Sequence, residues 1–164
     1  MKESTLIKGK SNAMRMLDSA GIAYRAREFD LKDNFTSGSD IARMQGEDPE
    51  RVFKTLVTEG PDRQYFVCVI PVDATLDLKK AARALSVKKL DMLPMKQLLP
   101  LTGYIHGGCS PIGMKKKFKT AIDETAVLFD SIYVSGGRPG LQIEIGPELL
   151  AEASEAEFAD LTVE

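Results

Sequence analysis

Histidine, cysteine and long apolar runs are scarce in this chain, and each scarcity excludes a class of protein. His106 is the single histidine among 164 residues, so a zinc site or a histidine-dependent nucleophilic triad has almost nothing to be built from. The two cysteines, Cys68 and Cys109, lack the spacing of metal ligands. We therefore expect no metal and no cofactor, a reducing cytoplasmic environment, and an ordinary loop position for His106.

No stretch of the sequence approaches eighteen uninterrupted apolar residues, and the first residues do not form the apolar centre of a signal peptide. We expect neither a membrane span nor secretion. Hydrophobic residues make up 43% of the chain and charged residues 28%, which is close to the average of globular proteins. The length suits one domain over residues 1–164, which needs neither disulfides nor metals to be stable.

Helix and strand signals alternate without the regular repeat of a doubly wound sheet. Ser11 and Gly21 are typical of the two ends of a helix, and Gly60-Pro61 is typical of a turn between two strands. The pattern predicts an α+β domain with a mixed, mostly antiparallel sheet. We predict helices over 11–21, 40–45 (after Ser37-Gly38-Ser39), 77–85, 95–99 and 147–153, and strands over 22–29, 53–59, 64–72, 120–122, 131–135 and 141–145.

Lys54 interrupts an otherwise apolar strand, Val52-Phe53-Lys54-Thr55-Leu56-Val57. Because strand side chains alternate, Val52, Lys54 and Leu56 share one face. One explanation is an edge strand, on which a lysine blocks aggregation or extends its ammonium group to water. The other is a pocket walled by the sheet, in which the lysine binds an anion or polarises a carbonyl. The predicted hairpin places Lys54 in the middle of a sheet and favours the pocket.

Basic and acidic residues are separated along the chain. Residues 79–119 contain ten basic residues and one acidic residue, a net charge of about +9, whereas all seven charged residues after Arg138 are acidic. Such asymmetry indicates a polyanionic partner for one face. The alternative is a set of solvated faces that happen to be neighbours in sequence.

Two glycine-rich segments, 103–113 and 133–140, can expose peptide N–H groups to a phosphate, an adenine or a developing oxyanion. The first has neither the Gly-Lys-Ser/Thr ending of a Walker A loop nor the Gly-x-Gly-x-x-Gly pattern of dinucleotide-binding proteins. Tight turns between strands are the alternative explanation for both segments.

Four segments in this order resemble the YbaK/EbsC family of Cys-tRNA(Pro) deacylases, which is related to the editing domain inserted in bacterial prolyl-tRNA synthetases. They are the run Val52-Phe53-Lys54-Thr55-Leu56, residues 76–82, residues 102–116 with their Gly-Gly-Cys-Ser-Pro loop, and residues 132–137 followed by Gly140-Leu141. The resemblance covers nearly the whole chain, from the first helix to the final acidic segment.

The resemblance implies a barrel-like sheet flanked by helices, and hydrolysis of the ester that joins a mischarged amino acid to tRNA. Lys54 corresponds to the essential lysine of the family, and the thiol of the substrate would help to expel the tRNA ribose. The resemblance and the neighbouring residues predict substrate binding by Tyr24, Phe29, Thr55, Gly103, Gly107, Gly108, Ser110, Pro111, Ser135, Gly136 and Gln142.

The resemblance also gives the basic segment a role, because its lysines could hold tRNA phosphates weakly and without regard to base sequence. Prolyl-tRNA synthetase is implied as a transient partner, and the chain is expected to be a monomer or a weak homodimer. The lysines predicted to bind tRNA are Lys79, Lys80, Lys88, Lys115, Lys116, Lys117 and Lys119.

One departure from the family concerns Gln142. Family members commonly have Gly-Leu-Asp-Ile-Glu where this chain has Gly140-Leu141-Gln142-Ile143-Glu144. The amide keeps hydrogen-bonding capacity but loses a negative charge that would act on Lys54 if the two lie close together. Two alternatives therefore stay open: a deacylase for Ala-tRNA(Pro) with the same fold, and a tRNA-binding module without catalytic activity.

Overall fold

The computed structural model describes residues 7–29, 46 and 48–164. The helix predicted over 40–45 lies outside these residues. None of the helices in the described ranges is long and apolar enough to cross a membrane. The helices are α1 (Asn12–Ala20), α3 (Leu78–Ala84), α4 (Leu98–Thr102) and α5 (Pro147–Ser154); the strands are β1 (Arg25–Glu28), β2 (Phe53–Glu59), β3 (Tyr65–Pro71), β4 (Asp91–Met92), β5 (Lys119–Asp123), β6 (Ile132–Ser135), β7 (Leu141–Ile145) and β8 (Glu157–Ala159).

Local signals in the sequence explain where α1 begins and ends. The Ser11 hydroxyl accepts a hydrogen bond from the Met14 amide at 3.2 Å, which satisfies one of the free donors of the first turn. Gly21 ends the helix with φ of 69°, in the left-handed region that favours glycine. The helix thereby presents Met14 and Leu17 to the protein interior, where both are buried.

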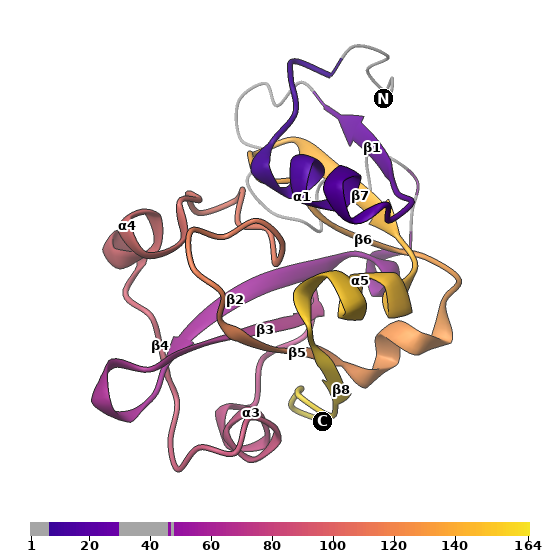
Figure 1. Ribbon diagram of the computed structural model, residues 1–164. Helices are drawn as coiled ribbons and strands as arrows, with labels where there is room; N and C mark the ends of the chain where they lie inside the picture. The colour runs from indigo at the N-terminus through magenta and orange to yellow at the C-terminus, as the bar shows by residue number, and fades with distance from the viewer. Residues whose placement is uncertain (1–6, 30–45, 47) are drawn as a thin grey trace.

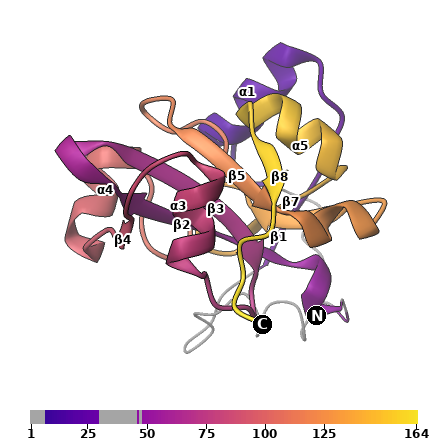
Figure 2. The same ribbon diagram turned by 90° about the horizontal axis from the view of Figure 1, so that it is seen from below.

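In the described part of the chain, the strands form two sheets that one bridge joins. The larger sheet has the order β4-β2-β3-β5-β8, and the smaller has the order β1-β7-β6. Val52 and Tyr133 form a parallel bridge that brings β6 alongside the beginning of β2. The β2–β3 hairpin is antiparallel as predicted, while β5 runs parallel to both β3 and β8. The predicted mixed, mostly antiparallel α+β architecture is confirmed (Figures 1 and 2).

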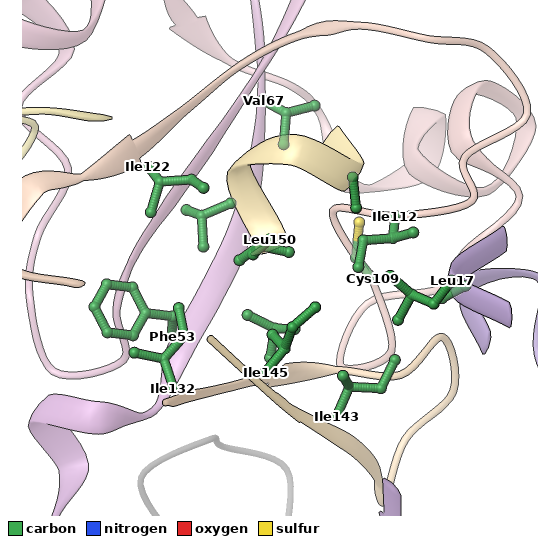
Figure 3. Packing of buried hydrophobic residues seen from close by; sticks show 14 of the residues in the cluster. Leu17, Phe53, Val67, Cys109, Ile112, Ile122, Ile132, Ile143, Ile145 and Leu150 are labelled. Carbon is green, nitrogen blue, oxygen red and sulfur yellow. The ribbon is translucent and has the colours of Figure 1, made fainter. Parts of the chain in front are cut away.

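The two faces of this combined sheet have different coverings. On the face that we call the α1/α5 face, Phe53, Val67, Ile122 and Ile143 pack against Leu17 of α1, Leu150 of α5 and their neighbours in one buried core (Figure 3). Strand alternation places Lys54, Cys68 and Tyr133 on the opposite face, which we call the α3 face. Ala81 and Ala82 of α3, with Leu85 just after the helix, share one buried cluster with residues of β3 and β5 on the α3 face. Leu56 of β2 and Ala159 of β8 pack against this cluster.

Three strands differ clearly from the prediction: the first strand has other bounds, and β4 and β8 were not predicted. The first strand spans Arg25–Glu28 rather than 22–29, since Ile22 instead ends α1 by donating its amide to the Leu17 carbonyl at 3.0 Å. Strand β8 was not predicted, because its three residues form a strand only by pairing with β5.

Candidate active site

Lys54 lies on the α3 face of β2, opposite Ile70 of β3. Its side chain is half-buried, and this burial lowers the pKa of the ammonium group, while the negative charge of Asp73 partly opposes the shift. Strand β2 pairs with β3 along its length, and on its other side it bridges to β6 at Val52 and pairs with β4 at its far end. This place inside the combined sheet argues against the edge-strand explanation for Lys54.

A row of polar residues crosses the smaller sheet toward Lys54. Arg27 of β1 pairs with Gln142 of β7, and Gln142 pairs with Ser135 of β6. Val52 and Tyr133 form a parallel bridge, and Lys54 and Ser135 each lie two residues further along their strands. Lys54 and Ser135 therefore share the α3 face. We call Arg27, Gln142, Ser135 and Lys54 the polar row.

Phe29 lies at the end of the polar row. Its amide donates a hydrogen bond to the Gly140 carbonyl at 2.8 Å, which continues the β1–β7 pairing by one residue. The alternation of β1 places its ring on the same face as Arg27, and the residue is buried. The structure thus brings four of the predicted site residues together on one face: Lys54, Phe29, Ser135 and Gln142.

Gln142 provides the clearest sign of a ligand in this row. The residue is 5% exposed, and its Oε1 atom has no hydrogen-bond partner among the described residues. A buried acceptor without a donor is costly, and such groups in native proteins commonly have a functional reason. Because Oε1 is an acceptor, a ligand that satisfies it must present an N–H or O–H group.

A network beside the polar row holds Tyr133 and Glu144 in place. The guanidinium carbons of Arg27 and Arg51 each lie 5.3 Å from the centre of the Tyr133 ring, which attracts cations to its face. Glu144 accepts a hydrogen bond from the Ser131 hydroxyl at 2.7 Å, and Arg51 donates to that hydroxyl at 2.8 Å. This network was not predicted from the sequence, although Arg25 and Arg27 at alternate positions of the first predicted strand were a signal for it.

The two glycine-rich segments pack directly against one another. A Cβ atom on Gly108 would lie 2.8 Å from the Cα atom of Arg138 and 2.8 Å from Cδ of Pro139. The hairpin end that carries these residues also carries Ser135, whose hydroxyl accepts a hydrogen bond from the Gly137 amide at 3.2 Å. The first glycine segment therefore reaches the same end of the sheet as the polar row.

The remaining predicted residues of the glycine segments shape the loops. Ser110 is fully buried, and its hydroxyl accepts a hydrogen bond from the Ile112 amide at 3.3 Å. Pro111 is buried, whereas Gly103 and Gly107 are exposed with φ of 85° and 86°, values that favour glycine. A Cβ atom on Gly136 would lie 2.5 Å from Cγ of Leu141, so this position accommodates only glycine without a shift.

Two predicted residues lie on the other face of the sheet. Tyr24 packs on the α1/α5 face, and its hydroxyl donates to the Asp18 carboxylate at 2.9 Å; burial raises the pKa of the phenol to about 12. Thr55 also alternates onto that face, and its buried hydroxyl oxygen has no partner among the described residues. The structure does not bring these side chains to Lys54, and their roles stay predictions.

Among the described residues, two of the seven lysines predicted to bind tRNA form ion pairs and five do not. Lys80 is paired with Asp160 at 2.9 Å and donates to the Thr162 carbonyl at 2.8 Å, and Lys117 is paired with Glu155. Lys119 is exposed and donates to the Leu85 carbonyl at 3.1 Å. The four others have exposed side chains and no ion pair among the described residues: Lys79, Lys88, Lys115 and Lys116.

Comparisons with known proteins identify the family of this chain. Residues 33–153 match the aminoacyl-tRNA editing domain family. A protein of Enterococcus faecalis named as a proposed Cys-tRNA(Pro)/Cys-tRNA(Cys) deacylase, EbsC, is 44% identical over 153 residues, which are 93% of this chain and 93% of that protein.

Two solved structures share the fold. One is a proposed trans-editing enzyme for prolyl-tRNA synthetase, with a TM-score of 0.82 and 23% identity over 93% of this chain and 96% of that chain. The other is the hypothetical protein APE2540, with a TM-score of 0.83 and 22% identity over 93% of this chain and 100% of that chain. The resemblance inferred from the sequence is confirmed: the chain belongs to the aminoacyl-tRNA editing domain family.

Proposed function

We propose that this chain hydrolyses the ester bond of mischarged aminoacyl-tRNA, with Cys-tRNA(Pro) as the substrate. The family match and the name of the Enterococcus faecalis relative support the reaction class. The observation that carries the proposal is the half-buried Lys54 in one row with the buried, unpaired Oε1 atom of Gln142. A cation and an unsatisfied acceptor on one face of the sheet suit a ligand that carries both a polarisable carbonyl and a hydrogen-bond donor.

An aminoacyl ester needs little more than positioning and electrostatic stabilisation, because the ester is already activated. In our proposal, the Lys54 ammonium group holds the ester carbonyl or a neighbouring oxygen, and it stabilises the negative charge that develops there. Gln142 accepts a hydrogen bond from the α-ammonium group or the thiol of the substrate. The Gly108 amide donates to the Ile105 carbonyl at 3.0 Å, so we assign the peptide N–H group of Gly107 to complete the electrostatic environment of the reacting atoms.

The two cysteines are unsuited to act as nucleophiles. Burial raises the pKa of both the Cys68 thiol and the Cys109 thiol to about 12, so the reactive thiolate is scarce at neutral pH. Cys68 is fully buried in the core beneath α3, and Cys109 packs among apolar residues on the α1/α5 face (Figure 3). A role for the substrate's own thiol is consistent with this arrangement.

The test is a deacylation assay with Cys-tRNA(Pro) and Ala-tRNA(Pro). We expect wild-type protein to release cysteine, and Lys54→Ala to lose at least a hundredfold in kcat/KM while its circular dichroism spectrum stays native. The matched control is Lys89→Ala, because Lys89 is an exposed lysine outside the polar row. Faster hydrolysis of Ala-tRNA(Pro) would show that this ester, rather than Cys-tRNA(Pro), is the substrate. Absence of turnover for both esters would contradict the enzymatic proposal and favour a tRNA-binding module.

We also infer a transient complex with prolyl-tRNA synthetase, because a solved structure with this fold is a proposed trans-editing enzyme for that synthetase. Weak contacts to tRNA phosphates carry no base information, so selection of tRNA(Pro) requires a further source. Adding purified prolyl-tRNA synthetase to the assay should lower KM for Cys-tRNA(Pro) and leave KM for another Cys-tRNA unchanged. Equal effects on both tRNAs would contradict this partner.

A further inference from the structure

A hollow lies on the α1/α5 face, away from Lys54. This pocket of about 140 Å³ lies between α1, residues 111–118 and the end of α5. Thr120, which lines the pocket, pairs with Val67 of β3. Val67 pairs with Val57 of β2, and Val57 lies three residues from Lys54 along that strand. The pocket is thus displaced by about 10 Å along the strand and lies on the opposite face, so it cannot hold the group that contacts Lys54.

The walls of the pocket are mostly apolar and its rim is basic. Lys116 and Lys117 line the pocket together with apolar groups that include two methionine thioethers and one aromatic ring. Lys117 is paired with Glu155, whereas Lys116 is exposed and has no ion pair in the described part of the chain. Apolar walls for a base beside cations for the backbone are typical of sites for single-stranded nucleic acid. The apolar wall residues are Met16, Pro111, Met114, Phe118 and Ala153.

Two buried hydroxyl groups set the polarity of the ligand. Thr120 donates its hydrogen to the Phe118 carbonyl at 2.9 Å, and Ser154 donates its hydrogen to the Leu150 carbonyl at 2.7 Å. Both residues line the pocket and both are less than 10% exposed. With their hydrogens engaged, the two oxygens can only accept hydrogen bonds from a ligand. The ligand must therefore be a donor at the end that enters the pocket.

The volume sets the size of the ligand. A cavity of about 150 Å³ holds one benzene ring, so this pocket holds one six-membered ring. Cytosine is a six-membered base with an exocyclic amino group, whereas uracil carries a carbonyl oxygen in the same place. The unpaired 3′ end of tRNA has two cytidines immediately before its terminal adenosine. A base with the required size and polarity is therefore present in the proposed substrate.

We propose that this pocket binds a cytosine base of the unpaired 3′ end of tRNA, upstream of the esterified adenosine. The identity of the ligand rests on the proposed function, because that function makes tRNA the substrate. In this arrangement, Met16 and Phe118 contact the faces of the base, the hydroxyl oxygens of Thr120 and Ser154 accept its amino group, and Lys116 contacts the neighbouring phosphate.

The test measures binding of unacylated RNA by fluorescence anisotropy at one low salt concentration. The probes are an acceptor-stem hairpin that ends in CCA and its twin that ends in UUA. We expect wild-type protein to bind the CCA hairpin roughly five-fold more tightly or better. Met16→Ala, which truncates a side chain that is 41% exposed, and Ala153→Leu, which fills the pocket, should both remove this preference.

Two further variants separate base contacts from phosphate contacts. Lys116→Ala should weaken binding of both hairpins by the same factor, and Lys89→Ala should change neither. Equal affinity of the wild-type protein for the two hairpins would overturn the proposal, and so would a preference that survives Ala153→Leu in a protein with native circular dichroism. Because neither RNA carries an ester, these binding results do not depend on hydrolysis. A negative result for the pocket would therefore leave the outcome of the deacylation assay unchanged.

Discussion

The contact between the two glycine-rich segments predicts the outcome of Gly108→Ala. A Cβ atom at this position would lie 2.8 Å from the Arg138 Cα atom, 2.8 Å from Pro139 Cδ and 2.9 Å from the Arg138 carbonyl carbon. These atoms belong to the main chain or to a ring fixed to it, so no side chain can rotate away. The φ angle of Gly108 is not in the left-handed region, so the substitution changes only the available space.

The expected result is a moderate loss of stability and a larger loss of activity. Forcing a methyl group into a close-packed contact costs about 1–3 kcal/mol. In a chain of this length each kcal/mol lowers Tm by about 2–4 °C, so we expect Tm to fall by about 2–12 °C. The 103–113 segment must withdraw from the hairpin end that carries Ser135 and Gln142, and a displacement near 1 Å can reduce turnover by about a hundredfold.

Gly21→Ala is the matched control. Gly21 has φ of 69°, and no atom lies within 4 Å of the place that a Cβ atom would occupy, so alanine there adds backbone strain of about 1–2 kcal/mol without a clash. It lies at the end of α1, outside the polar row. Thermal melts followed by circular dichroism and kcat/KM for Cys-tRNA(Pro) should show a similar Tm loss in both variants but lost activity only in Gly108→Ala. Full activity of Gly108→Ala would refute the need for this contact.

Three further predictions concern charge. Lys54→Met should raise Tm at pH 7 in thermal melts, since burial disfavours the ammonium group and lowers its pKa in the folded protein. Because the folded pKa lies below the unfolded value, this gain should shrink as pH rises through the folded pKa toward 10.5. Glu28→Gln should cost about 1 kcal/mol of stability by removing the pair in which Arg138 contacts both carboxylate oxygens. Because that pair lowers the pKa of Glu28, its contribution is present above pH 4.5 and is lost as pH falls through the folded pKa. The Tm values of wild type and variant should therefore converge in acid. Gln142→Asp should raise the pKa of Lys54 and move the pH profile of kcat/KM upward; an unchanged profile would contradict their proximity.

Elements set by local signals could be predicted from the sequence. The β2–β3 hairpin follows from Gly60-Pro61 between two apolar runs, β7 matches its predicted range of 141–145, and α5 begins at Pro147, a residue suited to the first turn of a helix. Long-range pairing could not be predicted. The register that sets Arg27 beside Gln142 joins residues more than a hundred positions apart, and no local signal specifies it.

The same limit explains the outcome for the candidate site. Alternation along the first predicted strand correctly places Tyr24 and Ala26 on one face, but it does not tell which face meets a ligand and which meets a helix. In the structure, the Tyr24 hydroxyl donates a hydrogen bond to Asp18 of α1 rather than lying near Lys54. Lys54 could be identified because a charge within an apolar strand conflicts with its surroundings, and such conflicts are expected at functional sites.

Folding partly neutralises the charge asymmetry of the sequence, and this predicts how the chain binds tRNA. Of the seven lysines predicted to contact tRNA, Lys80 and Lys117 are paired with acidic residues of the C-terminal segment. If each unpaired lysine contacts one phosphate, the plot of log Kobs against log salt should have a slope of about −4.5 for five contacts rather than about −6.3 for seven.

Glu155→Gln tests this directly. The substitution keeps a side chain of similar size at the end of α5 and removes the charge that holds Lys117. It should strengthen tRNA binding at low salt and steepen the salt slope by about one unit, because one more lysine then releases a counterion. Glu148→Gln, in the first turn of the same helix, is the matched control for the loss of one negative charge. If both variants steepen the slope equally, net charge rather than the Lys117 pair governs binding.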